Sequence, residues 1–235
     1  MPRETIRYTF TLPDNGKEVF DFHIDTQRLQ LLGDPTIVLP RWTRLEFEQC
    51  ENCPLQPETH PICPLAASIA PIVNRFDGIL SYQDVHIVVE TPERRISQPT
   101  TVQRGIGSLM GLVIAASGCP HTAFFKPMAR FHLPLASREE TVFRATATYL
   151  LAQYFLASEG KGGEFDLKGL QKIYKEMQVV NAAVVRRLRS ATDTDSSVNA
   201  IVVLDIYAKT VDMIIHESLD KIRYLFEPLF RNTTD

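Results

Sequence analysis

Four cysteines are the residues of this chain whose types and spacing best suit chemistry. Cys50 and Cys53 form a Cys-x2-Cys pair, Cys63 follows after nine intervening residues, and Cys119 follows after fifty-five more. A Cys-x2-Cys turn lets two sulfur atoms reach one metal ion, because the loop backbone folds back over the required distance. The pattern therefore predicts that Cys50, Cys53, Cys63 and Cys119 bind one metal ion.

Proline follows three of these cysteines, and two of the prolines precede apolar segments. Proline is favoured at the first position of a helix, so Cys63 and Cys119 are expected at helix N-caps. Free backbone N–H groups and the positive end of the helix dipole stabilise a thiolate at that position. Four thiolates around one metal ion carry a net negative charge, and donors of this kind offset it.

The donor set indicates a metal more clearly than it identifies which metal. Four protein thiolates suit a structural zinc site, which leaves no open position for a substrate. Proline after a cysteine is also typical of iron–sulfur cluster ligands, although the compact cysteine run of ferredoxins is absent. Zinc is the primary prediction and an iron–sulfur cluster is the alternative, while buried free thiols would need no metal.

Two further pairs of polar residues are candidates for a site. His60 and His121 lie two or three residues from a cysteine. With four thiols available, they are expected on the surface or beside the metal ligands. Arg130 and His132 flank Phe131 in a connection between two predicted helices. They could line a polar pocket, but a loop in which they satisfy backbone carbonyls is the favoured interpretation.

The sequence favours a role other than catalysis. Cys119 could act as a thiol nucleophile with a nearby histidine, but nearness along the chain is no evidence for a catalytic dyad. The glycines at 105, 107 and 111 lack the spacing of a dinucleotide-binding fingerprint, and no P-loop motif occurs.

Charge and hydropathy argue against nucleic-acid and membrane partners. The net charge is −3 and the isoelectric point is near 6.1, so no basic field is available to hold a polyanion. Short basic runs such as 186–189 are expected on a solvated helix face. No signal peptide or membrane span is recognisable. We therefore expect a cytoplasmic protein, in which thiols stay reduced and available to a metal.

The elements that must position the cysteines begin with strands. Asn15-Gly16 stands between alternating apolar and polar runs at 7–12 and 17–25, which predicts a β-hairpin. Further strands are predicted over 42–48, 84–91 and 94–97. These runs provide an antiparallel sheet of four or five strands within residues 1–99.

Helical periodicity replaces the strand pattern after residue 100. A Ser137…Glu140 capping box begins one of the helices. The four helices are expected over about 100–117, 137–158, 166–189 and 195–228. Strands followed by helices indicate an α+β fold, with an N-terminal antiparallel sheet and a C-terminal helical bundle at 100–235. The two parts are expected to form one compact unit.

The last predicted helix carries apolar residues that step by three and four. Such a stripe packs against other helices of the same chain or forms a homodimer interface, and the sequence leaves both open. The residues are Leu204, Ala208, Val211, Ile215, Leu219, Ile222, Phe226 and Leu229.

Three segments together resemble a family of uncharacterised bacterial proteins. They read QCENCPLQPETHPICPLA, VVETPERRISQPTTVQRGIGSLMGLVIAASGCPH and FFKPMARFHLPLASREE. The resemblance covers roughly residues 1–230, and the Cys-x2-Cys-x9-Cys pattern followed by Cys-Pro-His is its most specific part. A domain of unknown function implies no activity and no catalytic residue. The sequence thus predicts a metal-binding regulatory or interaction module.

Overall fold

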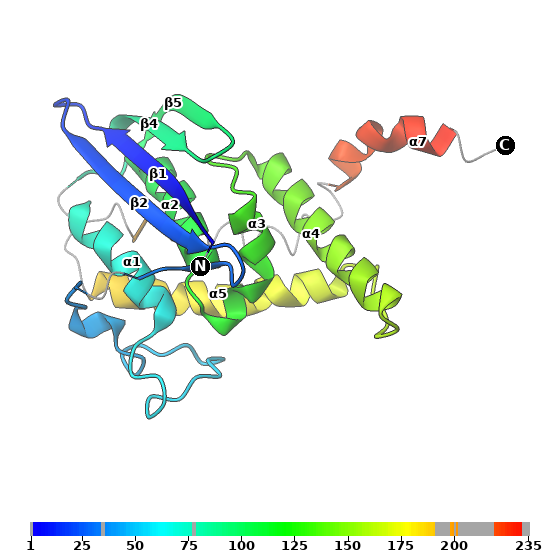
Figure 1. The fold of residues 1–235 in the computed structure, drawn as a ribbon, viewed down its shortest axis with the longest axis horizontal. Helices are drawn as coiled ribbons and strands as arrows, with labels where there is room; N and C mark the ends of the chain where they lie inside the picture. Colours follow the sequence, from blue (N-terminus) through cyan, green and yellow to red (C-terminus); the bar gives the residue numbers. More distant parts are fainter. Residues whose placement is uncertain are drawn as a thin grey trace.

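A computed structural model of the chain describes residues 2–33, 36–76, 79–190, 198–199, 201 and 219–231. Its N-terminal part contains a five-stranded antiparallel sheet in the order β3-β2-β1-β4-β5 (Figure 1). The α+β class and the antiparallel sheet are confirmed. The strands are β1 (Arg3–Thr11), β2 (Lys17–Asp25), β3 (Gln30–Leu31), β4 (Asp84–Glu90) and β5 (Arg95–Thr101).

The predicted hairpin joins β1 and β2. Asn15 has a φ of 63°, the left-handed conformation that asparagine tolerates better than most residues. The backbone N–H of Gly16 donates to Asp14 Oδ1 at 2.8 Å, and the N–H of Leu12 donates to the carbonyl of Gly16 at 2.8 Å. This turn sets the register in which Tyr8 lies opposite Phe20.

The strand predicted over 42–48 is wrong. Arg41–Thr43 form a short 3-10 helix, η1, and turns follow it up to residue 48. Only an isolated bridge between Arg44 and Ile62 has strand character there. Trp42 and Leu45 are both buried at a spacing of three, which suits a helical turn better than a period of two. The fifth strand is instead the two-residue β3.

The predicted helices are present where the structure describes them. Thr101 caps α2 by accepting from the N–H of Arg104, and Ser137 forms the complete capping box of α4. Leu167, rather than Asp166, is the N-cap of α5, although Asp166 accepts from the N–H of Lys168. The helices are α1 (Pro64–Arg75), α2 (Val102–Ala115), α3 (Lys126–Arg130), α4 (Arg138–Ser158), α5 (Lys168–Arg189) and α7 (Glu227–Arg231), with 3-10 turns η2 (Pro120–Phe125) and η3 (Arg223–Phe226).

Most of the last predicted helix, including Leu204, Ala208, Val211 and Ile215, lies outside the described residues. Residues 219–222 are helical and lead through η3 into α7. Within the described ranges, no single helix has the length and apolar character to cross a membrane; α2 and 120–130 satisfy both criteria only as a pair bent by 108°.

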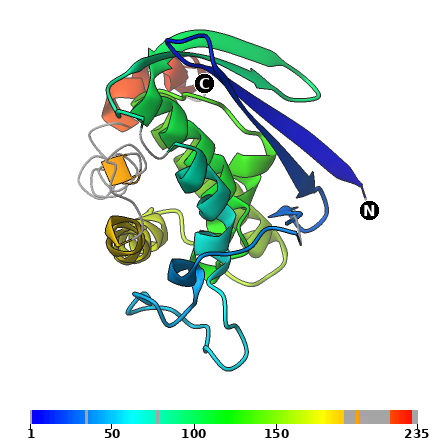
Figure 2. The ribbon, with the colours of Figure 1, turned by 90° about the vertical axis from the view of Figure 1, so that its left-hand side faces the viewer.

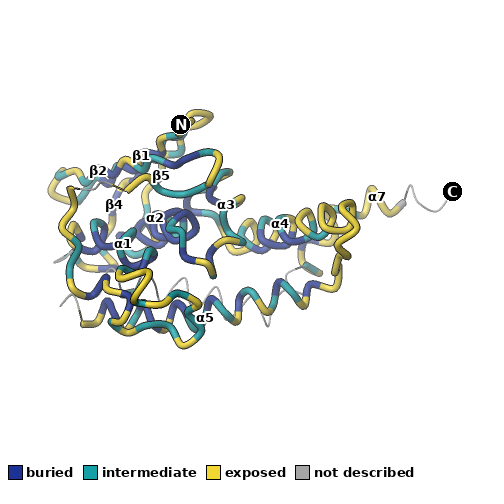
Figure 3. The backbone as a smooth tube through the Cα atoms, turned by 60° about the horizontal axis from the view of Figure 1, so that its bottom comes forward, coloured by how far each residue is buried: buried dark blue, intermediate teal, exposed yellow. Residues whose placement is uncertain are grey.

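Helices α1 and α2 cover one face of the sheet and separate it from α5 (Figure 2). One hydrophobic core joins the inward side chains of the sheet to α1, α2 and part of α5. Helix α2 approaches the sheet closely at Gly105, where an added Cβ would lie 2.2 Å from Ile87 Cδ1. Figure 3 shows α1 and α2 largely buried, whereas much of α4 is exposed.

Candidate metal centre

Three separate segments deliver the four cysteines. Cys50 and Cys53 lie in the long loop between η1 and α1, and the N–H of Cys53 donates to the carbonyl of Cys50 at 3.0 Å in a tight turn. Cys63 is the N-cap of α1 and Cys119 is the N-cap of η2, each followed by proline. The predicted N-cap positions are confirmed, and the N–H of Cys63 also ties α1 to the carbonyl of Thr43 at 2.8 Å.

The four thiols lie near enough to one another for their charges to interact. Burial is the main cause that raises the pKa of Cys119 to about 12; the neighbouring thiols of Cys63, Cys50 and Cys53 raise it further, and the N–H of His121 opposes the shift. Burial likewise raises the pKa of Cys50 to about 11, with contributions from Cys63 and Cys53. Groups influence one another in this way only when they lie close together.

The four cysteines are free thiols in this arrangement. Cys63 and Cys119 are buried, and Cys50 and Cys53 are half-buried. The side chains of Cys63 and Cys119 form no capping hydrogen bond with the helices that follow them. Across the part of the chain that the structure describes, no three His, Cys, Asp or Glu side chains already form a group that could hold a metal ion. Metal binding would therefore require the cysteine side chains to turn toward a common point.

A buried arginine lies beside this cluster. Arg187 of α5 is 1% exposed. Its Nη1 donates to the carbonyls of Trp42 and Arg44 at 2.7 Å each, and its Nη2 donates to that of Leu45 at 3.0 Å. Among the described residues it pairs with no carboxylate. Its positive charge acts on Cys50, whose pKa it lowers against the larger effect of burial.

The solvated face predicted for 186–189 is thus wrong at Arg187 and Leu188, which are both buried. Arg186 fits the prediction, since it is an exposed residue whose Nε lies 2.8 Å from Glu48 Oε2. The carbonyls that Arg187 binds lie more than 140 residues away along the chain, so no local pattern could have revealed its role.

The Cys50–Cys53 turn is docked on both η2 and α5. Asn52 Nδ2 donates to Glu176 Oε2 at 2.5 Å, and the carbonyl of Asn52 lies 2.7 Å from His121 Nε2. His121 Nδ1 lies 4.0 Å from Glu176 Oε2. Asn52 Oδ1 is buried without a hydrogen-bond partner in the described part of the structure. His121 is therefore a neighbour of the cysteine turn, whereas sequence reasoning missed Asn52 and Glu176.

The other predicted site residues lie apart from this network. His60 is exposed and contacts Thr59 Oγ1 through Nδ1. Arg130 lies 2.8 Å from Glu4 Oε1 on β1 and 3.9 Å from Glu93 Oε1. His60 therefore lies at the surface and Arg130 lies beside the sheet, and no described contact joins either residue to the cysteines.

His132 is buried behind the sheet, where its Nε2 lies 2.5 Å from the hydroxyl of Tyr8. That hydroxyl also contacts Ser108 Oγ at 3.0 Å. Burial lowers the pKa of His132 to about 3, and the charge of Arg144 adds to the shift. Arg130 and His132 line a small cavity of about 130 Å³ together with Glu4 and Glu93. The side chain of Arg130 forms ion pairs with both of these acids.

Comparison with known proteins assigns the chain to a family without a described activity. The model of a domain of unknown function, DUF6901, matches residues 6–227. The chain belongs to the DUF6901 family. No curated protein and no solved structure matches it. The DUF6901 match confirms the resemblance to an uncharacterised family, while bacterial origin and a family-wide cysteine pattern stay predictions.

Proposed function

We propose that this DUF6901 protein is a cytoplasmic metal-binding module whose cysteines hold one structural zinc ion. The ligands would be Cys50, Cys53, Cys63 and Cys119. The observation that supports the proposal most is that four thiols from three chain segments lie near enough for their charges to interact, and that the buried charge of Arg187 acts on one of them, Cys50. Thiols are the donors that zinc and iron–sulfur centres prefer in proteins.

The charge of Arg187 favours an anionic partner in this region. A buried guanidinium is stable only when hydrogen bonds and an opposite charge compensate its lost hydration. Three carbonyls supply the hydrogen bonds, but no carboxylate among the described residues supplies the charge. Four thiolates around Zn²⁺ carry a net negative charge, which would balance the guanidinium.

Zinc would add a further link between three separate parts of the fold. The loop between η1 and α1 forms no strand or helix within its described residues 44–62 beyond the bridge to Ile62. A metal held by this loop, by the start of α1 and by the start of η2 would fix all three, as structural zinc sites do. Four protein thiolates leave no open position, so the role is structural and not catalytic.

Elemental analysis of the native protein tests the proposal. Protein purified without oxygen should contain one zinc per chain and be colourless; a brown sample that contains iron and sulfide would replace zinc by the iron–sulfur alternative. Cys53→Ser should lose the metal, whereas His60→Gln, an exposed change in the same loop, should keep it. Metal-free wild-type protein with a normal fold would overturn the proposal.

The proposed partner of this module is a second copy of the chain, bound through the last helix. Among its described residues, Leu219 packs in a small cluster with α4 and α5, whereas Leu225, Leu229 and Phe230 are exposed. Light scattering should give twice the chain mass, and Leu229→Glu should shift the equilibrium toward monomers. A wild-type protein that stays monomeric at high concentration would contradict this part.

A further inference from the structure

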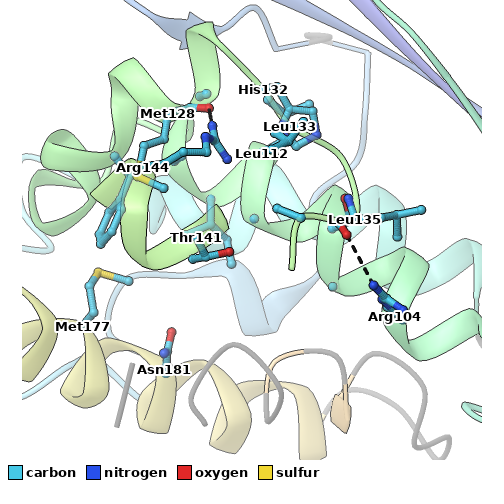
Figure 4. Close-up of a pocket in the computed structure, with 18 of the residues that line it drawn as sticks. Arg104, Leu112, Met128, His132, Leu133, Leu135, Thr141, Arg144, Met177 and Asn181 are labelled. Atoms are coloured by element: carbon cyan, nitrogen blue, oxygen red, sulfur yellow. Dashed lines mark hydrogen bonds between the residues drawn. The ribbon is translucent and has the colours of Figure 1, made fainter. Parts of the chain in front are cut away.

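A second region of the molecule has the features of a binding site. A cavity of about 230 Å³ lies between α2, α3, α4 and α5 (Figure 4). Most of its described wall is apolar, with Leu112, Met128 and Met177 among the lining residues. No cysteine lines it, so it is separate from the candidate metal centre. Ligand cavities of about 300 Å³ and above suit drug-sized molecules, so this one suits a smaller ligand.

Arg144 reaches this cavity from α4. Its Nη2 donates to the carbonyls of Met128 and Phe131 at 2.7 and 2.9 Å. Its Nε and Nη1 make no hydrogen bond within the described residues, and no described carboxylate forms an ion pair with it. Among the acidic groups, Glu140 has the largest effect on Arg144. Its charge raises the pKa of Arg144, but the larger effect of burial lowers that pKa. The Glu140 side chain is engaged with the N–H of Ser137.

Two more polar groups face the same space without partners. Asn181 of α5 is 5% exposed, and its side chain points from the helix into the cavity (Figure 4). Its amide makes no hydrogen bond within the described residues. Tyr174 also lines the cavity, and its hydroxyl makes no hydrogen bond in those ranges either. Buried polar groups are normally paired, so such groups in a cavity wall indicate a missing ligand.

We propose that this cavity binds a small amphipathic carboxylate, a molecule with one anionic group on a short apolar body. The carboxylate accepts a charge-assisted hydrogen bond from Nε or Nη1 of Arg144, the two nitrogens that have no partner within the described residues. Asn181 and Tyr174 supply further donors. The apolar body lies against Leu112, Met128 and Met177. Arg104, at another part of the wall, has its own partner in the carbonyl of Leu135 at 3.4 Å.

Glycine at position 111 provides a way to fill the cavity without damaging the fold. Gly111 lines the cavity on α2, and an added Cβ there meets nothing within 4 Å. A leucine at this position would extend into the ligand space, whereas an alanine would only remove helix-interior glycine, which favours the helix slightly. Gly111→Leu and Gly111→Ala are therefore a matched pair of variants.

Calorimetric titration of the full chain with octanoate tests the proposal, with 1-octanol and acetate as probes that lack the charge or the apolar body. Octanoate should bind, and both other probes should bind at least tenfold more weakly. Arg144→Gln should weaken octanoate binding roughly ten- to hundredfold, the range for a lost hydrogen bond to a charged group. Asn181→Ala should weaken it several-fold.

The glycine pair makes the test independent of any damage caused by losing Arg144. Gly111→Leu should abolish octanoate binding while its circular dichroism and thermal unfolding stay normal, and Gly111→Ala, which adds only one methyl group, should weaken binding much less. Equal binding of octanol and octanoate, unchanged binding in Gly111→Leu, or no binding of octanoate to the wild type would each overturn the proposal. None of these results depends on whether the cysteines bind zinc.

Discussion

Arg187 and Arg144 lie in two regions of the molecule, and each carries a positive charge that no described carboxylate balances. Each donates to backbone carbonyls, Arg187 from a buried position and Arg144 from a half-buried one, and neither pairs with a carboxylate among the described residues. They differ in what lies beside them. The charge of Arg187 acts on the thiol of Cys50, whereas Arg144 lines an apolar cavity.

The difference indicates two kinds of missing anion. A cluster of thiols becomes strongly anionic only when a metal replaces its protons. An apolar cavity with unpaired donors has no anion of its own and must take one from outside. A buried cation without a protein counter-charge is therefore a useful sign of a ligand, and its neighbours indicate the chemistry of that ligand.

Metal removal should have the largest effect on the Arg187 region. Treating zinc-loaded protein with a strong chelator should lower the free energy of unfolding by about 4 kcal/mol, as for a ligand present at roughly a thousand times its dissociation constant. Urea unfolding with and without added zinc measures this difference. Identical unfolding curves would mean that zinc does not stabilise this region, and Arg187 would then lack its proposed counter-charge.

Loss of the buried guanidinium should have the next largest effect. Arg187→Met should destabilise the fold by about 3 kcal/mol or more, because the carbonyls of η1 and its loop lose their donors. Arg186→Gln is the matched control, since its exposed pair with Glu48 contributes less than about 1 kcal/mol. If zinc binds in this region, Arg187→Met should also weaken zinc binding, whereas Arg186→Gln should not.

Acid should destabilise the region near Arg144 through His132. The folded pKa of His132 is about 3, against an ordinary value of 6.5. The unfolded chain therefore takes up a proton that the folded one refuses, and the stability from neutral His132 is lost as the pH falls from about 6.5 toward 3. Between pH 7 and 5 the loss should be about 2 kcal/mol.

The variant His132→Asn isolates this contribution. It should be less stable at neutral pH, because it loses the contact with Tyr8, and its stability should depend less on pH between 7 and 5. An equal pH dependence in the variant and the wild type would assign the acid sensitivity to other groups, including the cysteine region.

The docking of the cysteine turn should give the smallest effect. Asn52→Ala removes the hydrogen bond to Glu176 and should cost about 1 kcal/mol. Its unpaired Oδ1 is removed at the same time, which reduces the loss. Thermal unfolding measures the change. A loss as large as that for Arg187→Met would mean that the turn, and not the buried charge, dominates this region.

Local sequence signals predicted the elements but not the contacts between distant ones. The Asn15-Gly16 turn, the Ser137 capping box and the Cys-Pro helix starts depend on neighbouring residues, and the structure has all of them. The strand predicted over 42–48 failed because the backbone there is bound by Arg187 from α5. Alternation alone carries no information about such a partner.

The two candidate sites also differ in how far the sequence alone could predict them. Cysteine is rare enough for its spacing to suggest a shared site, so those residues could be named from the sequence. Arg144, Asn181 and Gly111 are ordinary helix residues, and only the packing of α2, α4 and α5 reveals that they face one cavity. Arg187 was hidden for the same reason, since its partners are carbonyls of a distant loop.

X-ray absorption at the zinc edge of the native protein tests the central claim most directly. The account predicts one bound zinc ion surrounded by four sulfur atoms at about 2.3 Å, and loss of the bound zinc in Cys119→Ser. A wild-type spectrum dominated by nitrogen and oxygen ligands, or a folded protein that binds no zinc, would contradict it.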